Sequence, residues 1–146
     1  MASVSIYLNF DGHTEEAFNY YKSIFGGEFA NLQRFGEMPP QEGMPPLPPD
    51  IHHQIMHIHL PILDGFDLMG SDSPEIFGQK VQMGNNFHLN VTLDNREDTK
   101  KYFEALKEGG TVTRELADMF WGDYFGSCID KYGVQWMLSF PARREG

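Results

Sequence analysis

Three histidines in one apolar stretch are the residues of this sequence best suited to chemistry. His53, His57 and His59 fall on one face of a strand predicted for residues 53–60, with Ile55 among them, because successive side chains of a strand point to opposite faces. The other face is apolar and holds Met56, Ile58 and Leu60. Imidazoles two positions apart can bind one metal ion or exchange a proton with a ligand oxygen.

A lining role is favoured over metal chelation for these histidines. No cysteine or carboxylate shares the motif, and polar side chains of this kind suit the lining of a small-molecule cup. His57 is the strongest functional candidate, as a donor or proton acceptor to a ligand oxygen. The alternative is a relocated metal site made of His57, His59 and His88.

Further polar and aromatic residues complete the predicted ligand-binding set. They lie opposite the apolar stripes of their strands, where the alternatives are a ligand cup and a solvated sheet surface. Trp121 is a candidate for stacking on a ligand, whereas alternation with Val134 and Leu138 predicts a core position for Trp136. The predicted ligand-binding residues are Tyr7, Asn9, His57, His59, His88, Asn90, Trp121 and Gln135, and no catalytic residue is assigned.

Two residues with reactive or charged side chains are interpreted as structural. Cys128 has no His, Lys or Arg beside it, which favours a small buried side chain over a reactive thiol. Asp130 opens the turn Asp130-Lys131-Tyr132-Gly133 and is interpreted as stabilising it.

A repeated strand and helix must position these residues. Apolar residues alternate up to Phe10, followed by Asp11, an amphipathic helix and a glycine pair at 26–27; the pattern recurs up to Leu93, with Asp94, a second helix and a glycine pair at 109–110. The spacing agrees at both ends, because 94 minus 11 and 109 minus 26 both equal 83. Each half is predicted as strand, helix, strand, strand, strand.

The predicted elements have the following bounds. The second helix is expected over residues 96–108, and the later strands over residues 28–35, 53–60, 66–71, 111–116, 120–129 and 134–140. Residues 36–50 hold six of the nine prolines and are expected to form a loop. A lid over the cup is the favoured role of this loop, and docking of a partner on Pro45–Pro48 is the alternative.

Composition and charge narrow the functional classes. A net charge of −10 would repel a phosphate backbone, so nucleic acid is not expected as a partner. One cysteine cannot form an internal disulfide, and neither a signal sequence nor a long apolar run opens the chain, which predicts a cytoplasmic protein without membrane contact. The aromatic content of 14% exceeds what one small core absorbs and indicates a cavity or a partner subunit.

Motifs along nearly the whole chain resemble the PhnB-like branch of the vicinal-oxygen-chelate superfamily, which includes glyoxalase, bleomycin-resistance and dioxygenase relatives. The resemblance rests on residues 7–10, 17–18, 21–27, 35–39, 68–72, 120–121 and 130–137. It implies an α+β fold: a single domain over residues 1–146 in which tandem βαβββ modules, residues 1–72 and 85–141, form a curved mixed-sheet cup in a homodimer. His57 also matches a histidine of this branch.

The same resemblance bears on cofactors. Members of the branch are often labelled demethylubiquinone methyltransferase-like, yet no strand here leads into a G-x-G-x-x-G turn that would hold a nucleotide cofactor. Metal-dependent members of the superfamily use a His or carboxylate from the opening strand of each module and a Glu four residues after the turn glycine of each closing hairpin. Counted from Gly65 and Gly133, the Glu positions are Met69 and Met137, and a thioether is a poor ligand for these ions.

The opening strands add little to such a site. Residues 1–10 contain no His, Asp or Glu, and His88 alone matches a family ligand, on the opening strand of the second module. We therefore expect no metal and no cofactor. The favoured hypothesis is a homodimer that binds a small, partly apolar molecule in a metal-free cup; the alternatives are a metal-dependent lyase or dioxygenase with a relocated histidine site, and an interaction module that uses the proline loop.

Overall fold

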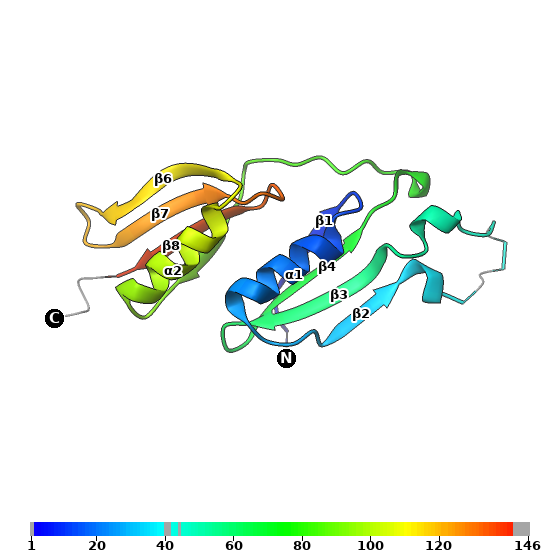
Figure 1. Ribbon diagram of the computed structural model, residues 1–146, viewed down its shortest axis with the longest axis horizontal. Coiled ribbons are helices and arrows are strands. Elements are labelled where there is room, and N and C mark those ends of the chain that lie inside the picture. The colour runs from blue at the N-terminus through cyan, green and yellow to red at the C-terminus, as the bar shows by residue number, and fades with distance from the viewer. Residues whose placement is uncertain (1, 40–41, 44, 142–146) are drawn as a thin grey trace. The chain divides into compact units, whose positions relative to one another are not determined.

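The computed structural model describes residues 2–39, 42–43 and 45–141. The chain divides into two compact units, residues 1–82 and 83–146, each with its own sheet and helix (Figure 1). The prediction that both modules form one domain stays a prediction.

The first unit follows the order strand, helix, strand, strand, strand. Its elements are β1 (Ile6–Phe10), α1 (Thr14–Phe25), β2 (Asn31–Arg34), β3 (Ile55–Ile62) and β4 (Phe66–Asp72), with short 3-10 helices at Phe35–Glu37, Pro49–Ile51 and Glu75–Phe77. The strands pair in the order β1-β4-β3-β2, and β1 runs parallel to β4 while the other pairs are antiparallel.

The second unit repeats this arrangement. Its elements are β5 (Leu89–Thr92), α2 (Arg96–Lys107), β6 (Thr111–Asp118), β7 (Tyr124–Ile129) and β8 (Gln135–Phe140), paired in the order β5-β8-β7-β6. Again the first and last strands are parallel and the others antiparallel. The predicted α+β class and the duplicated βαβββ order are confirmed.

Each helix packs on one face of its own sheet, and the two cores lie in those interfaces. In the first unit Ala17, Phe18 and Tyr21 of α1 are fully buried against β3 and β4. Gly70 of β4 permits this close packing, because a Cβ there would lie 2.9 Å from the Phe18 ring. In the second unit α2 buries Phe103 and Leu106, as the helical spacing predicts.

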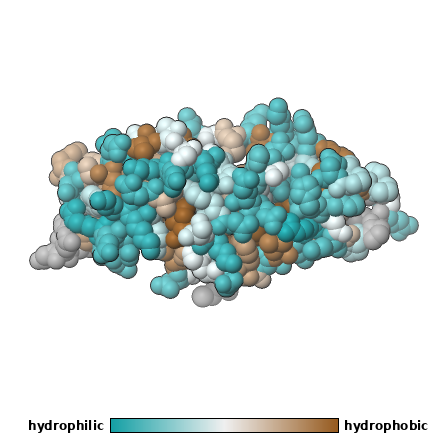
Figure 2. All heavy atoms as spheres, in the orientation of Figure 1, coloured by the Kyte–Doolittle hydropathy of each residue, from teal (hydrophilic) through white to brown (hydrophobic). Residues whose placement is uncertain are grey.

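The outer surfaces of the helices are mainly hydrophilic, in keeping with the acidic composition. Figure 2 shows the side on which the helices lie in front of their sheets, and hydrophilic residues predominate there, with hydrophobic residues scattered between them. Among the described residues no helix combines the length and the apolar character needed to cross a bilayer.

The predicted strand over residues 53–60 is partly wrong. It begins at Ile55, so His53 lies in the preceding turn, and the pairing with β2 shifts in register between Gln33 and Arg34. Gln33 pairs with His57 whereas Arg34 pairs with Ile55, which leaves Met56 as an extra residue. This bulge puts Ile55 in the core, fully buried, and not on the face of the histidines.

Several strand bounds also differ from those predicted. The strand predicted over 28–35 is limited to Asn31–Arg34, and that predicted over 120–129 begins only at Tyr124. β6 continues two residues beyond the predicted end, to Asp118. Within the proline loop, residues 40, 41 and 44 lie outside the described part of the chain, and the role of this loop stays a prediction.

Candidate functional site

The face of each sheet that its helix does not cover carries the candidate site residues. We call it the open face. On the first sheet Met69 pairs with Tyr7 on one side and with His59 on the other; on the second sheet Met137 pairs with Asn90 and Ser127. Met69 and Met137 therefore occupy the same place in the two sheets, as the count from the turn glycines predicts.

The open face of the first unit holds four of the predicted binding residues. His57 Nδ1 lies 2.7 Å from the side-chain amide of Asn31, and its ring lies 5.9 Å from that of Tyr7. His59 Nε2 lies 2.8 Å from a carboxylate oxygen of Asp67. Each imidazole therefore has its own polar partner, and their role as lining groups stays a prediction.

Asn9 and Tyr7 lie on the opening strand of that face. The Asn9 side-chain oxygen accepts hydrogen bonds from the Ser71 and Ser73 hydroxyls, at 3.4 and 3.3 Å, and Tyr7 is 43% exposed. Both side chains are thus available to a molecule that lies on the open face of this sheet.

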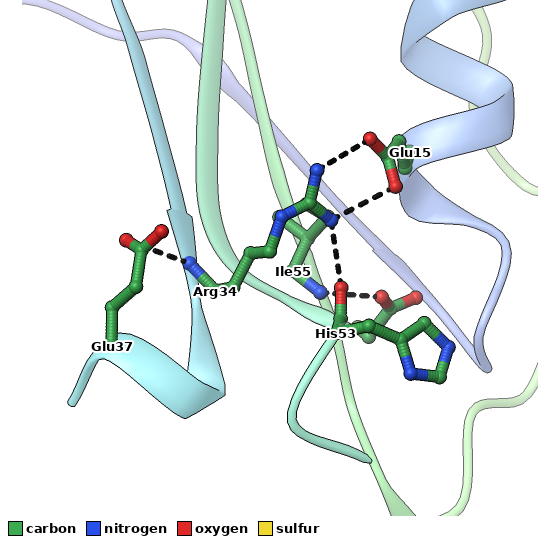
Figure 3. Close-up of polar contacts among 6 residues, drawn as sticks. Glu15, Arg34, Glu37, His53 and Ile55 are labelled. Carbon is green, nitrogen blue, oxygen red and sulfur yellow. Dashed lines mark hydrogen bonds and ion pairs between the residues drawn. The ribbon is translucent and has the colours of Figure 1, made fainter. Parts of the chain in front are cut away.

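An ion pair ties β2 to the first turn of α1 at the edge of this unit. Figure 3 shows the Arg34 guanidinium donating to both carboxylate oxygens of Glu15, at 2.9 and 2.7 Å, and to the backbone carbonyl of His53 at 2.8 Å. The hydrogen bond and charge of Arg34 lower the pKa of Glu15, and those of Glu15 raise the pKa of Arg34. These contacts position the turn at His53 and are structural.

The open face of the second unit contains a pocket of about 490 Å³. Strands β5, β6, β7 and β8 and the β6–β7 loop all contribute to it. It combines aromatic, thioether, hydroxyl and amide groups with one cationic and one acidic side chain. The lining residues are His88, Asn90, Arg114, Trp121, Asp123, Phe125, Ser127, Met137 and Ser139.

The β6–β7 loop fixes two of these side chains. The Met119 amide donates to the Asp123 carbonyl at 2.8 Å, and Gly122 takes a φ of +102° that favours glycine. Trp121 Nε1 donates to one carboxylate oxygen of Asp123 at 3.2 Å, and its ring meets Phe125 at a centroid distance of 6.1 Å. The other oxygen of Asp123 is buried and has no hydrogen-bond partner among the described residues.

The sequence prediction found part of this pocket. His88, Asn90 and Trp121 line it together, although His88 lies one residue before β5 and not within the strand as predicted. Gln135 does not line it, and its side chain donates to the Phe87 carbonyl at 2.7 Å. Tyr7, Asn9, His57 and His59 belong to the first unit.

Sequence reasoning missed four hydrophilic lining residues, Arg114, Asp123, Ser127 and Ser139. Alternation along β8 was a usable signal for Ser139, which follows Gln135 and Met137 on the same face. Arg114 was harder to place, because β6 shifts its register against β7 on both sides of it.

The donor set of the open faces does not fit the superfamily metal. Met69 and Met137 offer thioethers where hard or borderline ligands are needed. In the part of the chain that the structure describes, no three residues among His, Cys, Asp and Glu are grouped so that they could hold an ion. The relocated site is not assembled within the first unit, where His57 and His59 have separate partners.

Three buried side chains of the second unit serve the fold. Asp130 accepts from the Tyr132 and Val134 amides in its turn, at 2.8 and 3.1 Å, and from Trp136 Nε1 at 2.8 Å. Trp136 is 1% exposed, which confirms its predicted core position. Cys128 is fully buried, and burial raises the pKa of its thiol to about 11. The structural interpretation of both Asp130 and Cys128 is confirmed.

Taken together, the repeat and the pocket define a duplicated βαβββ protein with a small-molecule-sized hollow on an open sheet face. The chain belongs to the Glyoxalase/Bleomycin resistance protein/Dioxygenase superfamily, whose family model matches residues 6–138. The predicted PhnB-like relationship is also confirmed, by relatives that match along nearly the whole chain.

Three of these relatives show the extent of the similarity. Protein YjdN of Escherichia coli is 31% identical, with 93% of each chain covered. The structure of PA1353 from Pseudomonas aeruginosa is 31% identical, with a TM-score of 0.79 and 94% and 98% of the two chains covered. A PhnB protein of Bacillus cereus, described as a putative 3-demethylubiquinone-9 3-methyltransferase, is 26% identical, with a TM-score of 0.75 and 95% and 99% covered.

Proposed function

We propose that the protein binds a small, partly apolar molecule on the open faces of its sheets, without the superfamily metal. The observation that carries the proposal is the pocket of about 490 Å³, whose volume lies within the range typical of small-molecule sites. Aromatic and thioether side chains supply apolar surface, and a few polar groups supply hydrogen bonds that orient the bound molecule. This is the composition expected of a site that orients one bound molecule.

The open face of the first unit is also proposed as a binding surface, because it combines the same kinds of side chain. Tyr7, Asn9, His57 and His59 lie on its open face, and Met69 there is the counterpart of Met137. His57 would serve as donor or acceptor to a ligand oxygen. A homodimer in the cytoplasm is part of the same proposal, and sedimentation velocity tests the dimer.

Methyl NMR of protein labelled at its methionine methyl groups tests binding at the pocket. We expect small aromatic molecules from a mixed library to shift the Met137 methyl signal, which a Met137→Leu variant assigns. Asn90→Trp should weaken such binding at least about tenfold, because the indole fills part of the pocket that Asn90 lines.

Lys100→Trp is the matched control for this test. Lys100 is exposed on α2, which covers the other face of this sheet, and it lies outside the pocket lining, so the variant adds the same side chain without filling the pocket. Binding should be unchanged within about twofold. A library in which nothing shifts Met137, or equal losses in the two variants, would contradict the proposal.

A further inference from the structure

Within the function proposed above, we infer that the pocket of the second unit selects an aromatic carboxylic acid that also carries an N–H or O–H donor. The acid group would lie on Arg114, the ring between the aromatic and thioether groups, and the donor on Asp123. This assignment of ligand class depends on the proposed function.

Arg114 supplies a cation that has no counterion among the described residues. It is exposed and lines the pocket, and its hydrogen-bond contact within the described part of the chain is to the sulfur of Met119, at 4.0 Å. It forms no ion pair with any residue that the structure describes, unlike Arg34, which binds Glu15 with both terminal nitrogens. A carboxylate is the ligand group that suits such a guanidinium best, because it accepts two parallel hydrogen bonds from it.

Asp123 supplies an acceptor without a donor. Trp121 Nε1 occupies one carboxylate oxygen, and the other oxygen is buried with no partner among the described residues. An unpaired buried acceptor is costly, so the carboxylate gains the free energy of a strong hydrogen bond when its side chain turns toward a ligand donor in the pocket. Because the acceptor is an acid, the ligand needs a donor near it and cannot place its own carboxylate there.

The two charges together restrict the ligand more than either does alone. Arg114 and Asp123 line the same pocket without forming an ion pair. A ligand with only an acid group leaves Asp123 unsatisfied, and one with only a donor leaves Arg114 without an anion. A molecule with both groups, separated by its framework, satisfies both side chains.

The uncharged lining specifies the framework as a planar ring. Trp121 and Phe125 present aromatic surface, and Met137 at the centre of the sheet presents a polarisable thioether. Contacts with these groups are made by the ring itself, so they are favourable for aromatic molecules with many different substituents. Ring contact therefore supplies affinity, and the two charged side chains supply selection.

A matched set of ligands tests the inference by calorimetry on the full-length protein. 3-Aminobenzoate and 4-aminobenzoate carry both groups at two separations, benzoate lacks the donor, and the corresponding aminobenzamide replaces the acid with a neutral group of the same shape. We expect the better aminobenzoate to bind at least about tenfold more tightly than either benzoate or its own amide.

Two variants assign each preference to a side chain. In Arg114→Gln the aminobenzoate and its amide should bind equally within about twofold, since the cation is gone. In Asp123→Leu the aminobenzoate and benzoate should bind equally, since the acceptor is gone. Lys100→Gln and Asp94→Leu make the same charge changes at exposed positions outside the pocket and should preserve both preferences.

The outcomes separate this inference from the proposed function. If the neutral amide or benzoate binds the wild-type protein as well as the aminobenzoate and still shifts the Met137 methyl signal, the ligand class is wrong and the binding function stands. If the preferences survive in Arg114→Gln and Asp123→Leu, other residues produce them and the inference fails. If no ring compound shifts Met137, the inference and the proposed function fail together.

Discussion

Met69 and Met137 occupy the positions at which metal-dependent members of the superfamily have glutamate ligands. Each lies at the centre of an open face, paired with the opening strand on one side and with the preceding hairpin strand on the other. Their equivalence could be predicted because each follows its turn glycine by four residues and the hairpins keep the same length. A thioether at both places leaves apolar, polarisable surface where a metal ligand would be needed.

Three residues that sequence reasoning misplaced or missed, His53, Ile55 and Arg114, lie at irregular backbone. A strand pattern assumes strict alternation, and the bulge at Met56 breaks it, so Ile55 is buried and His53 precedes the strand. Arg114 lies between two register shifts of β6, where alternation gives no reliable face. The imidazole, amide and indole groups of the pocket were predicted as His88, Asn90 and Trp121, but its charged side chains were not.

The burial of Cys128 predicts that its thiol reacts slowly in the native protein. Burial raises the pKa of its thiol to about 11 from an ordinary value of 9.0, so near neutral pH the folded protein has about a hundredfold less thiolate than an exposed cysteine. We expect a thiol-specific disulfide reagent to label the native protein at least about a hundredfold more slowly than the protein unfolded in urea.

The pH dependence of stability follows from the same shift. The unfolded thiol loses its proton near pH 9.0 while the folded one keeps it up to about pH 11, so this group's contribution to stability is constant below pH 9 and falls between the two values. Cys128→Ala should remove that part of the fall. Labelling of the native protein at the rate of the unfolded protein would contradict the burial.

At the scale of elements, one carboxylate holds the start of α1 and the start of β3 in place, although it lies far from α1 in the sequence. Asp72, at the end of β4, accepts from the amide and hydroxyl of Thr14, at 3.1 and 2.8 Å, and from the Ile55 amide at 2.8 Å. It thereby caps α1, whose own flanking residue His13 provides no side-chain cap. The sequence predicts the helix from its apolar stripe, but a cap supplied from 58 positions away leaves no local pattern.

The second helix supplies a matched comparison for Asp72. Asn95 caps α2 locally, accepting from the Asp98 amide at 2.7 Å. We expect Asn95→Ala to lower the free energy of unfolding by about 1 kcal/mol. Asp72→Ala should lower it by roughly 2–4 kcal/mol, because it leaves two backbone amides and a hydroxyl without their buried acceptor.

Urea denaturation followed by circular dichroism measures both losses. The midpoint should fall in both variants with an unchanged slope, and the fall should be larger for Asp72→Ala. Equal losses in the two variants would show that the remote cap contributes no more than an ordinary local one.

At the scale of the whole molecule, the duplication has preserved the backbone and changed the side chains. Both units keep the order and pairing of four strands with one helix on the sheet, which is why hydrophobic periodicity and the repeat were enough to predict the order of elements, whereas the α+β fold was predicted from the family resemblance. The open faces have diverged: the first carries His57 and His59 with polar partners, and the second carries the pocket with Arg114 and Asp123. Divergence of this kind, on a conserved framework, is how one fold hosts different sites.

Thermal unfolding with and without metal ions tests the remaining alternative, a relocated histidine site. An ion that binds the native state with a dissociation constant of about 10 µM would, at about 1 mM, stabilise the protein by about 2.7 kcal/mol. For a chain of this length that free energy corresponds to a rise in Tm of roughly 5–10 °C. We expect Mn²⁺, Ni²⁺ and Zn²⁺ to change the Tm by less than about 1 °C, because His57 and His59 are held by separate partners. A larger rise that disappears in the His57→Ala, His59→Ala double variant would instead establish the relocated site, since that variant removes two of its three imidazoles.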